Sequence, residues 1–365
     1  MAKVVLSGYY GFNNLGDEGV LFSILRTLRA QRPELKLTVL SNDPAKTSKL
    51  YNVEAVNRWN PKEVWQTLRQ ADLLISGGGS LLQDVTSPKS LIYYLGIVWL
   101  AKKLGLPVVY YAQGIGPINT RLGQYLVPKV SNSVDLITVR DQDSKNLLTS
   151  LKVTNPQIYV TADPVFSLYH REIERDQGQK LLTRSGVDLE EKTPLIGISV
   201  RGWKKLTGYQ KVLARLGDNL TQQGYKVVLL PFHFPDDVCV CREIARLMKE
   251  EPVIVKEQCG VVEMLGVIGE MQLIVGMRLH ALIMAAVMGV PAIGISYDPK
   301  IDSILKLIEQ PNAGRVETLD YELLNAEVEE TLAHREEIVA KLFERVAELR
   351  VEARETANLA LKLLK

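Results

Sequence analysis

Arg278 and His280 are the residues of this chain whose types and spacing are best suited to chemistry. They lie in segment 276–280, between an apolar run that predicts a strand and the uncharged stretch 281–297. The carboxyl end of a strand, beside the positive end of a helix, is where α/β proteins hold anionic ligands. An arginine there binds a carboxylate or phosphate through paired hydrogen bonds, and a histidine transfers a proton near neutral pH. The alternative is structural, with Arg278 in a salt bridge and His280 in the core.

Three loops rich in glycine and amide side chains follow predicted strands in the first half of the chain. Residues 8–18 read Gly-Tyr-Tyr-Gly-Phe-Asn-Asn-Leu-Gly-Asp-Glu, and the other two loops are the triple glycine 77–79 and the segment 113–117. Backbone N–H groups and amides with few charges suit a sugar better than a phosphate, although the triple glycine also fits a simple tight turn. The residues expected to contact the sugar are Asn13, Asn14, Gly77, Gly78, Gly79, Gln83 and Gln113.

Two further charged residues lie at strand-to-helix turns. Asp17 opens a predicted helix at 17–31, where it either caps the helix or contacts a ligand. Arg201 follows a predicted strand at 195–200 and either points toward the ligand-binding edge or lies on the surface. Asp163 precedes a proline and is expected to make a structural turn, while His233, between aromatic residues, fits packing and ligand binding equally well.

Composition and missing motifs argue against several classes of protein. Lys and Arg number 44 against 42 acidic residues, so the charge balance gives no reason to expect general nucleic-acid binding. The loops match neither the dinucleotide-binding nor the P-loop pattern, and no serine-hydrolase elbow occurs. With four histidines and no ligand-like spacing, we expect no metal and no cofactor. The three cysteines and the N-terminus suggest neither a disulfide framework nor a signal peptide, so we expect a cytoplasmic protein.

Apolar runs that predict strands alternate with amphipathic runs that predict helices along most of the chain. This alternation is typical of parallel sheets with helices on both faces. A polar stretch interrupts it, so we expect an α/β fold of two doubly wound, Rossmann-like domains facing across a cleft, which is a glycosyltransferase-B-like architecture. The expected division is an N-terminal domain at 1–168, a linker at 169–192, a C-terminal domain at 193–315 and a helical tail at 316–365.

Three apolar segments need separate interpretation. In the tail, Val339, Leu342, Val346 and Leu349 form one stripe, which predicts a helix packed across the body of the protein. The stretch 281–297 contains Gly289 and a proline and divides into helix, turn and strand rather than a membrane span. The segment 91–100, with its aromatic residues and following lysines, suits either a helix on a bilayer surface or a helix buried beneath the sheet, which we favour.

Together these segments resemble the polysaccharide pyruvyl transferase family, specifically its bacterial cell-wall members. The resemblance rests on residues 8–18, 76–79, 113–117 and 276–280 and covers about residues 1–310. It implies transfer of the pyruvyl group of phosphoenolpyruvate to two hydroxyls of a sugar, forming a cyclic ketal. It also implies a lipid-linked acceptor containing N-acetylmannosamine, at the inner face of the membrane, whose finished polymer anchors S-layer proteins. Donor binding in the family falls on the positions of Arg201, Arg278, Leu279 and His280.

The chemistry of phosphoenolpyruvate agrees with these residues. Its phosphate and carboxylate match two arginines and a helix N-terminus, and a protonated His280 would supply a proton to the enol carbon. Asp17 would orient or deprotonate an acceptor hydroxyl. Two alternatives stay open: a nucleotide-sugar-dependent glycosyltransferase or sugar-nucleotide epimerase of the same fold, and a non-catalytic sugar-binding protein. The first would need an acidic residue for a ribose, for which Glu257, Glu263 and Glu270 are available.

Overall fold

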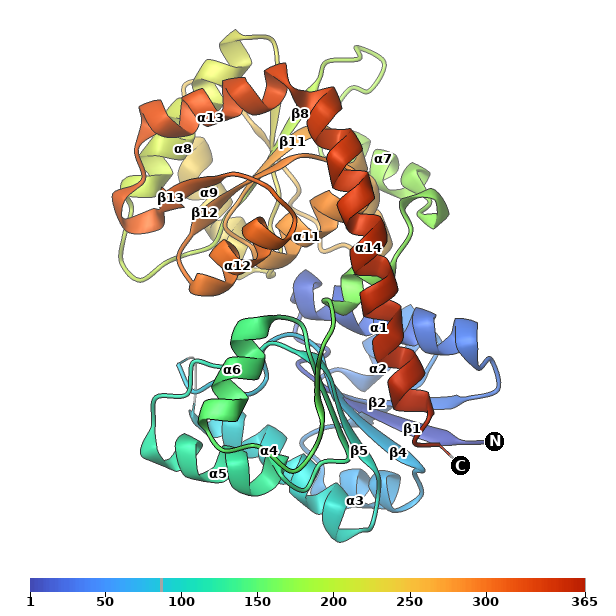
Figure 1. Ribbon diagram of the computed structural model, residues 1–365. Coiled ribbons are helices and arrows are strands. Elements are labelled where there is room, and N and C mark those ends of the chain that lie inside the picture. Colours follow the sequence, from blue (N-terminus) through green and yellow to red (C-terminus); the bar gives the residue numbers. More distant parts are fainter. Residues whose placement is uncertain (86–87, 365) are drawn as a thin grey trace. The chain divides into compact units, whose positions relative to one another are not determined.

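The computed structural model describes residues 1–85 and 88–364, which form two compact units. The first unit comprises Met1–Ser167 with Leu349–Lys365, and the second comprises Leu168–Glu348. Each is built around one parallel sheet with helices packed on it, so the two expected doubly wound, Rossmann-like domains are confirmed (Figure 1). Residues 169–192, interpreted from the sequence as a linker, belong to the second unit, and the helical tail is shared between the units.

The first unit contains a seven-stranded parallel sheet in the order β3-β2-β1-β4-β5-β6-β7. Its strands are β1 Lys3–Ser7, β2 Lys36–Ser41, β3 Glu54–Asn57, β4 Leu73–Gly77, β5 Val108–Gln113, β6 Leu136–Val139 and β7 Ile158–Val160. Its helices are α1 Leu15–Gln31, α2 Pro44–Tyr51, α3 Pro61–Arg69, α4 Pro88–Lys103, α5 Arg121–Ser131, α6 Gln142–Ser150 and the short η1 Pro164–Ser167. Helices α3 to α6 pack on one face of the sheet, and α1 and α2 lie on the other (Figure 1).

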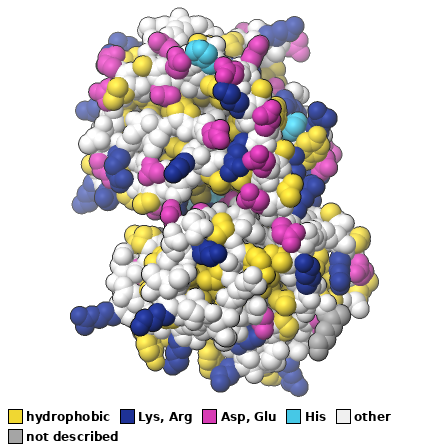
Figure 2. All heavy atoms as spheres, viewed as in Figure 1, with side chains coloured by type: hydrophobic (Ala, Val, Ile, Leu, Met, Phe, Trp, Pro, Cys, Tyr) yellow, Lys and Arg dark blue, Asp and Glu magenta, His cyan; other side chains and the backbone are white. Residues whose placement is uncertain are grey.

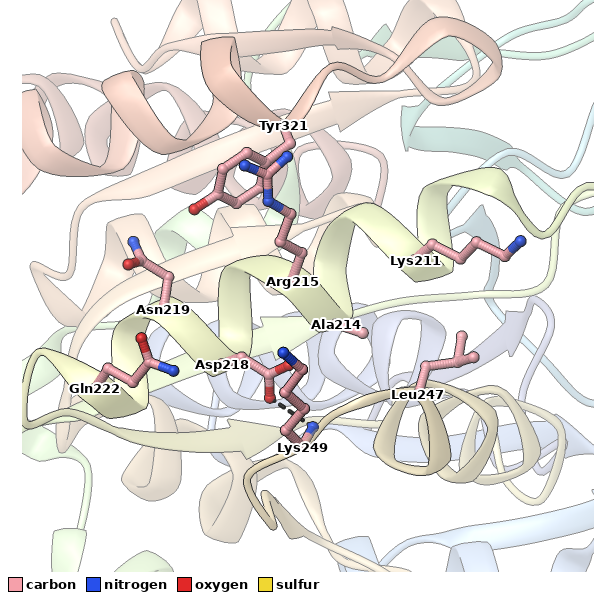
Figure 3. Close-up of a pocket in the computed structure, with 9 residues that line it drawn as sticks. All are labelled: Lys211, Ala214, Arg215, Asp218, Asn219, Gln222, Leu247, Lys249 and Tyr321. Carbon is pink, nitrogen blue, oxygen red and sulfur yellow. Dashed lines mark hydrogen bonds between the residues drawn. The ribbon is translucent and has the colours of Figure 1, made fainter.

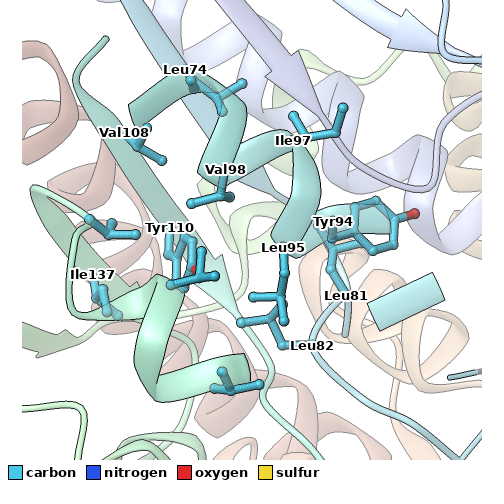
Figure 4. Close-up of a cluster of buried hydrophobic side chains, with 14 of the residues drawn as sticks. Leu74, Leu81, Leu82, Tyr94, Leu95, Ile97, Val98, Val108, Tyr110 and Ile137 are labelled. Atoms are coloured by element: carbon cyan, nitrogen blue, oxygen red, sulfur yellow. The ribbon is translucent and has the colours of Figure 1, made fainter. Parts of the chain in front are cut away.

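The core of the first unit lies between this sheet and the helices α3 to α6. Leu95 and Val98 of α4 are buried in one cluster with the sheet residues Val108 and Tyr110, and Tyr94 lies beside Leu81 (Figure 4). Strands that are covered on both faces must be apolar along their whole length, which is why the central strands are readable from the sequence. The interpretation of segment 91–100 as a helix packed beneath the sheet is therefore confirmed for the inward side of α4.

The second unit contains a six-stranded parallel sheet in the order β10-β9-β8-β11-β12-β13. Its strands are β8 Leu195–Ser199, β9 Lys226–Leu229, β10 Val253–Ile254, β11 Met271–Gly276, β12 Ala292–Ser296 and β13 Asn312–Arg315. Its helices are η2 His170–Glu172, α7 Arg175–Arg184, α8 Gly208–Gln222, α9 Asp236–Leu247, α10 Val261–Gly269, α11 Leu279–Met288, α12 Pro299–Leu307, η3 Val316–Thr318 and α13 Tyr321–Ala333. The uncharged stretch 281–297 is helix, turn and strand, as predicted, and no described helix is long and apolar enough to span a bilayer.

The predicted tail helix is α14, Arg335–Leu361. Its apolar stripe is buried at Leu342 and Val346 within the second unit and at Leu349 within the first. Further along the helix, Thr356 Oγ1 donates to Thr161 Oγ1 at 2.9 Å, so the end of the tail is held in the first unit by a buried hydrogen bond.

Helices α7 and α10 approach each other through glycine. A Cβ atom added at Gly178 would lie 2.3 Å from the backbone carbon of Gly266 and 2.3 Å from the backbone nitrogen of Val267. Backbone atoms cannot rotate away as a side chain can, so this crossing tolerates only glycine on α7. The close packing explains why α7 belongs to the second unit.

We expect Gly178→Ala to destabilise the protein by roughly 1–3 kcal/mol, because the added methyl group overlaps the α10 backbone. The matched control is Gly96→Ala within α4, where a Cβ meets no atom within 4 Å. Since alanine is the better helix former, that control should raise stability by about 0.5–1 kcal/mol. Urea unfolding followed by circular dichroism measures both changes. A Gly178→Ala protein as stable as the wild type would contradict the close approach of α7 and α10.

Candidate active site

Arg201 and Arg278 follow two neighbouring strands at the point where the strand order of the second sheet reverses. β8 pairs with β11 in parallel, with Ser199 opposite Gly276, and the Met277 N–H donates to the Ser199 carbonyl at 2.8 Å. The chain after β8 crosses toward β9, and the chain after β11 crosses in the opposite direction toward β12. The carboxyl ends of β8 and β11 are therefore not covered by either connection. Open α/β sheets bind ligands at this position.

Arg278 is held by the buried carboxylate of Asp237, the second residue of α9. Arg278 Nε donates to Asp237 Oδ2 at 2.8 Å, and Nη2 donates to Oδ1. Oδ2 also accepts the backbone N–H groups of Phe232 and His233, at 3.1 and 2.9 Å. Asp237 is only 1% exposed, so its charge depends on this arginine. The salt bridge considered for Arg278 from the sequence is present, and it leaves Nη1 outside the pair.

Arg201 is held differently, by aromatic rings. Its Nη1 donates to the Tyr297 hydroxyl at 3.0 Å, and its guanidinium carbon lies 4.7 Å from the Tyr297 ring centroid and 5.8 Å from that of Trp203. Within the described part of the chain, no carboxylate pairs with Arg201, and its Nε is buried without a hydrogen-bond partner. Aromatic faces orient a guanidinium without neutralising it. Arg201 therefore offers a positive charge and a donor to an anion.

His280 and Leu279 are the first two residues of α11, and Arg278 is its N-cap residue. The helix begins where the sequence predicted, so these three residues share its positive end with the tip of β11. His280 is partly buried. His233 lies near the same edge, but its Nδ1 is 3.2 Å from Asp236 Oδ2 and thus faces a carboxylate of α9.

In the first unit, the loop 8–18 and the triple glycine meet at the corresponding point of the sheet. β1 pairs with β4, with Ser7 opposite Ser76, and the Tyr10 hydroxyl donates to the Gly77 carbonyl at 2.6 Å. Gly78 and Gly79 have φ of +95° and +62°, a backbone conformation that favours glycine. A Cβ at Gly79 would lie 2.4 Å from Asp17 Oδ1. The glycine turn and the Asp17 carboxylate are therefore directly adjacent.

The two asparagines of the loop hold it in shape. Asn14 Oδ1 accepts the Gly16 N–H at 3.1 Å and caps α1, and its Nδ2 donates to Asp17 Oδ2 at 2.7 Å. Asn14, and not Asp17, is therefore the N-cap, and α1 begins two residues earlier than predicted. Asn13 Oδ1 accepts a hydrogen bond from Lys46 Nζ at 2.7 Å.

Gln113 and Gln83, both predicted to contact substrate, also have internal partners. Gln113 is fully buried, and its Nε2 donates to the Ser76 carbonyl at 2.7 Å and to Ser76 Oγ at 3.0 Å. With no exposed surface, Gln113 acts through the end of β4 that it holds. Gln83 Oε1 accepts the Val85 N–H at 2.9 Å. Asp163 is structural as expected, since it pairs with buried Arg140 at 3.0 Å.

Arg58 supports the loop of the first unit and was missed from the sequence. Its Nη1 donates to the Gly8 carbonyl at 2.6 Å, and its guanidinium carbon lies 4.3 Å from the Tyr93 ring centroid and 5.1 Å from those of Phe12 and Trp59. It follows β3, a polar edge strand that gave no signal in the sequence. Apart from the adjacent Trp59, its partners come from two distant segments, the loop 8–18 and α4.

Glu18 is a second residue that sequence reasoning overlooked. Its Oε1 accepts the Gly11 N–H at 2.8 Å, and its Oε2 accepts the Tyr51 hydroxyl at 2.6 Å. Burial raises the pKa of the Glu18 carboxyl, while the hydrogen bonds from Tyr51 and Gly11 lower it, and burial prevails. The loop is thus fastened to α1 by a carboxylate whose charged form is disfavoured.

A separate pocket on the second unit contains none of the residues predicted from the sequence (Figure 3). It is lined by Lys211, Ala214, Arg215, Asp218, Asn219, Gln222, Leu247, Lys249 and Tyr321. Two of its charged groups have partners of their own: Arg215 pairs with Glu322 at 2.9 Å, and Asp218 accepts the Lys249 backbone N–H at 2.7 Å. It lies along α8, away from the strand tips, and we do not assign the site to it.

Comparison with known proteins identifies the family of this chain. The family model of polysaccharide pyruvyl transferases matches residues 14–299. The amylovoran biosynthesis protein AmsJ of Erwinia amylovora is 23% identical, in an alignment that covers 96% of each chain. The chain therefore belongs to the polysaccharide pyruvyl transferase family and is a transferase.

Solved structures of low sequence identity share the fold. A glycosyltransferase from Rickettsia africae has a TM-score of 0.66 at 10% identity, covering 100% of this chain and 99% of its own. The UDP-GlcNAc 2-epimerase of Neisseria meningitidis, bound to UDP-GlcNAc, has a TM-score of 0.64 at 11% identity, covering 100% and 99%. The expected glycosyltransferase-B-like fold is confirmed. At these identities the likeness concerns the fold alone.

We expect Glu18→Gln to change how stability depends on pH. A carboxyl whose pKa is raised on folding binds its proton more tightly in the folded state, so its contribution to stability is lost as pH rises through the folded pKa. The wild type should therefore lose stability relative to Glu18→Gln from acidic toward neutral pH. Urea midpoints at several pH values measure the difference.

The exposed substitution Glu34→Gln is the matched control for that pH series. A stability difference between wild type and Glu18→Gln that stays constant with pH, or that grows in favour of the wild type, would contradict the burial of the Glu18 charge.

Proposed function

We propose that this transferase moves the pyruvyl group of phosphoenolpyruvate onto two hydroxyls of a sugar, forming a cyclic ketal and releasing phosphate. The acceptor we propose is an N-acetylmannosamine-type unit of a lipid-linked cell-wall polysaccharide precursor. Family membership supports pyruvyl transfer, and the similarity to a protein of amylovoran biosynthesis supports a polysaccharide product. The observation that carries the donor assignment is Arg201, a cation that contacts aromatic rings and pairs with no carboxylate among the described residues.

The second unit is the proposed donor site. Phosphoenolpyruvate carries a phosphate and a carboxylate, and Arg201, the Nη1 group of Arg278 and the N-terminus of α11 offer complementary charge. Asp237 holds Arg278 in a fixed direction before any ligand arrives, which lowers the entropic cost of binding. The pairing with Asp237 also makes Arg278 the weaker cation of the two, so Arg201 contributes more to anion binding.

The proposed reaction places His280 as the acid. His280 gives a proton to the CH₂ carbon of phosphoenolpyruvate, and the neighbouring carbon becomes electrophilic. One acceptor hydroxyl adds to that carbon and loses its proton to a base. The C–O bond to phosphate then breaks, the second hydroxyl adds and loses its proton, and the ring closes. Two protons leave the acceptor, one enters the new methyl group, and the other leaves with phosphate or solvent.

The first unit is the proposed acceptor site. Asp17, adjacent to the Gly78–Gly79 turn, is the proposed orienting or deprotonating group for an acceptor hydroxyl. Glu18, Arg58 and Gln113 do not contact the sugar in this proposal. They hold the loop and the end of β4 on which the contact residues lie.

Replacing Arg201 tests the donor site. Loss of a charge-assisted hydrogen bond should weaken phosphoenolpyruvate binding by about 10- to 100-fold in Arg201→Ala. Calorimetric titration measures the affinity, and Arg215→Ala on α8 is the matched control, because that exposed arginine lies outside the site. Unchanged affinity in Arg201→Ala would remove the donor assignment. Thermal stabilisation by nucleotide sugars but not by phosphoenolpyruvate would favour the alternative glycosyltransferase or epimerase.

Replacing His280 separates chemistry from binding. His280→Gln should lower kcat by about 10²- to 10⁴-fold while phosphoenolpyruvate affinity changes little, because a proton donor acts mainly in the transition state. Phosphate release in the presence of acceptor measures turnover. His233→Gln, at the neighbouring strand tip, should keep most of its activity. Wild-type turnover in His280→Gln would exclude His280 as the acid.

A further inference from the structure

Three neighbouring helices of the first unit repeat one surface pattern. On α3, α4 and α5 an exposed aromatic residue is followed four positions later by a basic residue that lies over its ring. The distances from cation to ring centroid are 5.2, 5.9 and 5.3 Å, for the pairs Trp65–Arg69, Trp99–Lys103 and Tyr125–Lys129. Together with Ile92 and Leu122, these residues are called the aromatic–basic face.

The aromatic–basic face is not needed for the core. On α4, Leu95 and Val98 pack inward against the sheet (Figure 4). Ile92 and Trp99, which are seven positions apart and therefore on the same side of the helix, lie on its outer side. Trp99 is 53% exposed and Tyr125 60% exposed. On α5, Leu122 and Tyr125 are likewise exposed at a three-residue spacing. Apolar side chains repeated on the outer sides of adjacent helices mark an interaction surface.

Charge on these helices is strongly one-sided. Glu63 is their single acidic residue, against seven basic residues: Lys62, Arg69, Lys89, Lys102, Lys103, Arg121 and Lys129. Lys102 is paired with Asp135 at 2.6 Å, which still leaves six basic residues. The whole chain is nearly balanced, with 44 basic and 42 acidic residues. Figure 2 shows Lys and Arg beside hydrophobic side chains along the lower margin of the first unit, where Figure 1 places α3, α4 and α5.

We propose that the aromatic–basic face binds the surface of a bilayer that contains anionic lipids. Tryptophan and tyrosine rings are amphipathic and favour the headgroup region, while isoleucine and leucine enter the acyl boundary. Lysine and arginine beside each ring reach the lipid phosphates, and each adds to the attraction of a negative surface. A negatively charged protein partner would require only the basic residues. The repeated pairing of a ring with a cation on three helices fits a planar, water-to-lipid boundary better.

The proposed lipid binding is independent of the proposed reaction. It requires no donor, acceptor or catalytic residue, so a negative vesicle test leaves the reaction untouched and a negative activity test leaves the lipid binding untouched. If both hold, the enzyme meets a lipid-linked acceptor at the membrane on which that acceptor is carried.

Flotation of the full chain with vesicles tests the proposal. The wild type should float with vesicles of phosphatidylcholine and phosphatidylglycerol at low salt, less with phosphatidylcholine alone, and less as salt rises. Ile92→Ser with Trp99→Ser should reduce bound protein by at least about tenfold. The matched control is Leu323→Ser with Val351→Ser, two exposed apolar residues outside the three helices.

Charge reversal supplies the second arm. Lys103→Glu with Lys129→Glu should reduce binding to phosphatidylglycerol vesicles by roughly tenfold or more, whereas Lys211→Glu with Lys256→Glu should not. All eight positions are exposed, so unfolding temperatures should stay near that of the wild type. Wild-type protein that does not float, or face and control variants that lose binding equally, would overturn the proposal. The molar mass of the protein in solution, measured without vesicles, gives one further outcome. If this mass rises with protein concentration in the wild type but not in Trp99→Ser, the face is a self-association surface and the lipid proposal is wrong.

Discussion

The alignment of two central strand ends in each sheet is the constraint on which the candidate site depends. In a doubly wound sheet, the chain leaves two neighbouring strands in opposite directions, so the carboxyl ends of these strands stay uncovered by crossovers. The pairs are β1 with β4 in the first unit and β8 with β11 in the second. Because each pair is in register, with Ser7 opposite Ser76 and Ser199 opposite Gly276, residues just beyond the strands are brought together whatever their distance in sequence.

The residues at these strand ends differ in charge environment between the two units. In the first, Glu18 and Gln113 are tied to backbone groups, and the surroundings are glycine and amide. In the second, burial of Asp237 is tolerable only because Arg278 and two backbone N–H groups compensate its charge. Arg201 contacts aromatic rings and, in the part of the chain that the structure describes, pairs with no carboxylate. An uncompensated guanidinium with a buried, unpaired Nε costs desolvation energy, which an anionic ligand would return on binding.

The sequence predicts the central strands of both sheets but not every edge strand. Strands such as β6 and β12 are readable from the sequence, because burial on both faces requires continuous apolar residues. The edge strands β3 and β13, with α2 and α12 before them, were missed, since their residues are polar or half-exposed. The same limit applies to the site. Arg278 and Arg201 follow recognisable strands, but Asp237, 41 residues from Arg278, is identified only by the fold.

Helix α4 shows why periodicity alone could not decide between burial and membrane contact. Both sides of this helix are apolar, so the sequence offers no polar stripe from which to read its orientation. The two interpretations are compatible, because the sheet covers the side that carries Tyr94 and Leu95 and leaves Ile92 and Trp99 outside. A helix that needed only to cover the sheet would be more soluble with polar residues at the outer positions. Exposed apolar area carries a free-energy cost in water, which is removed only when a second surface covers it.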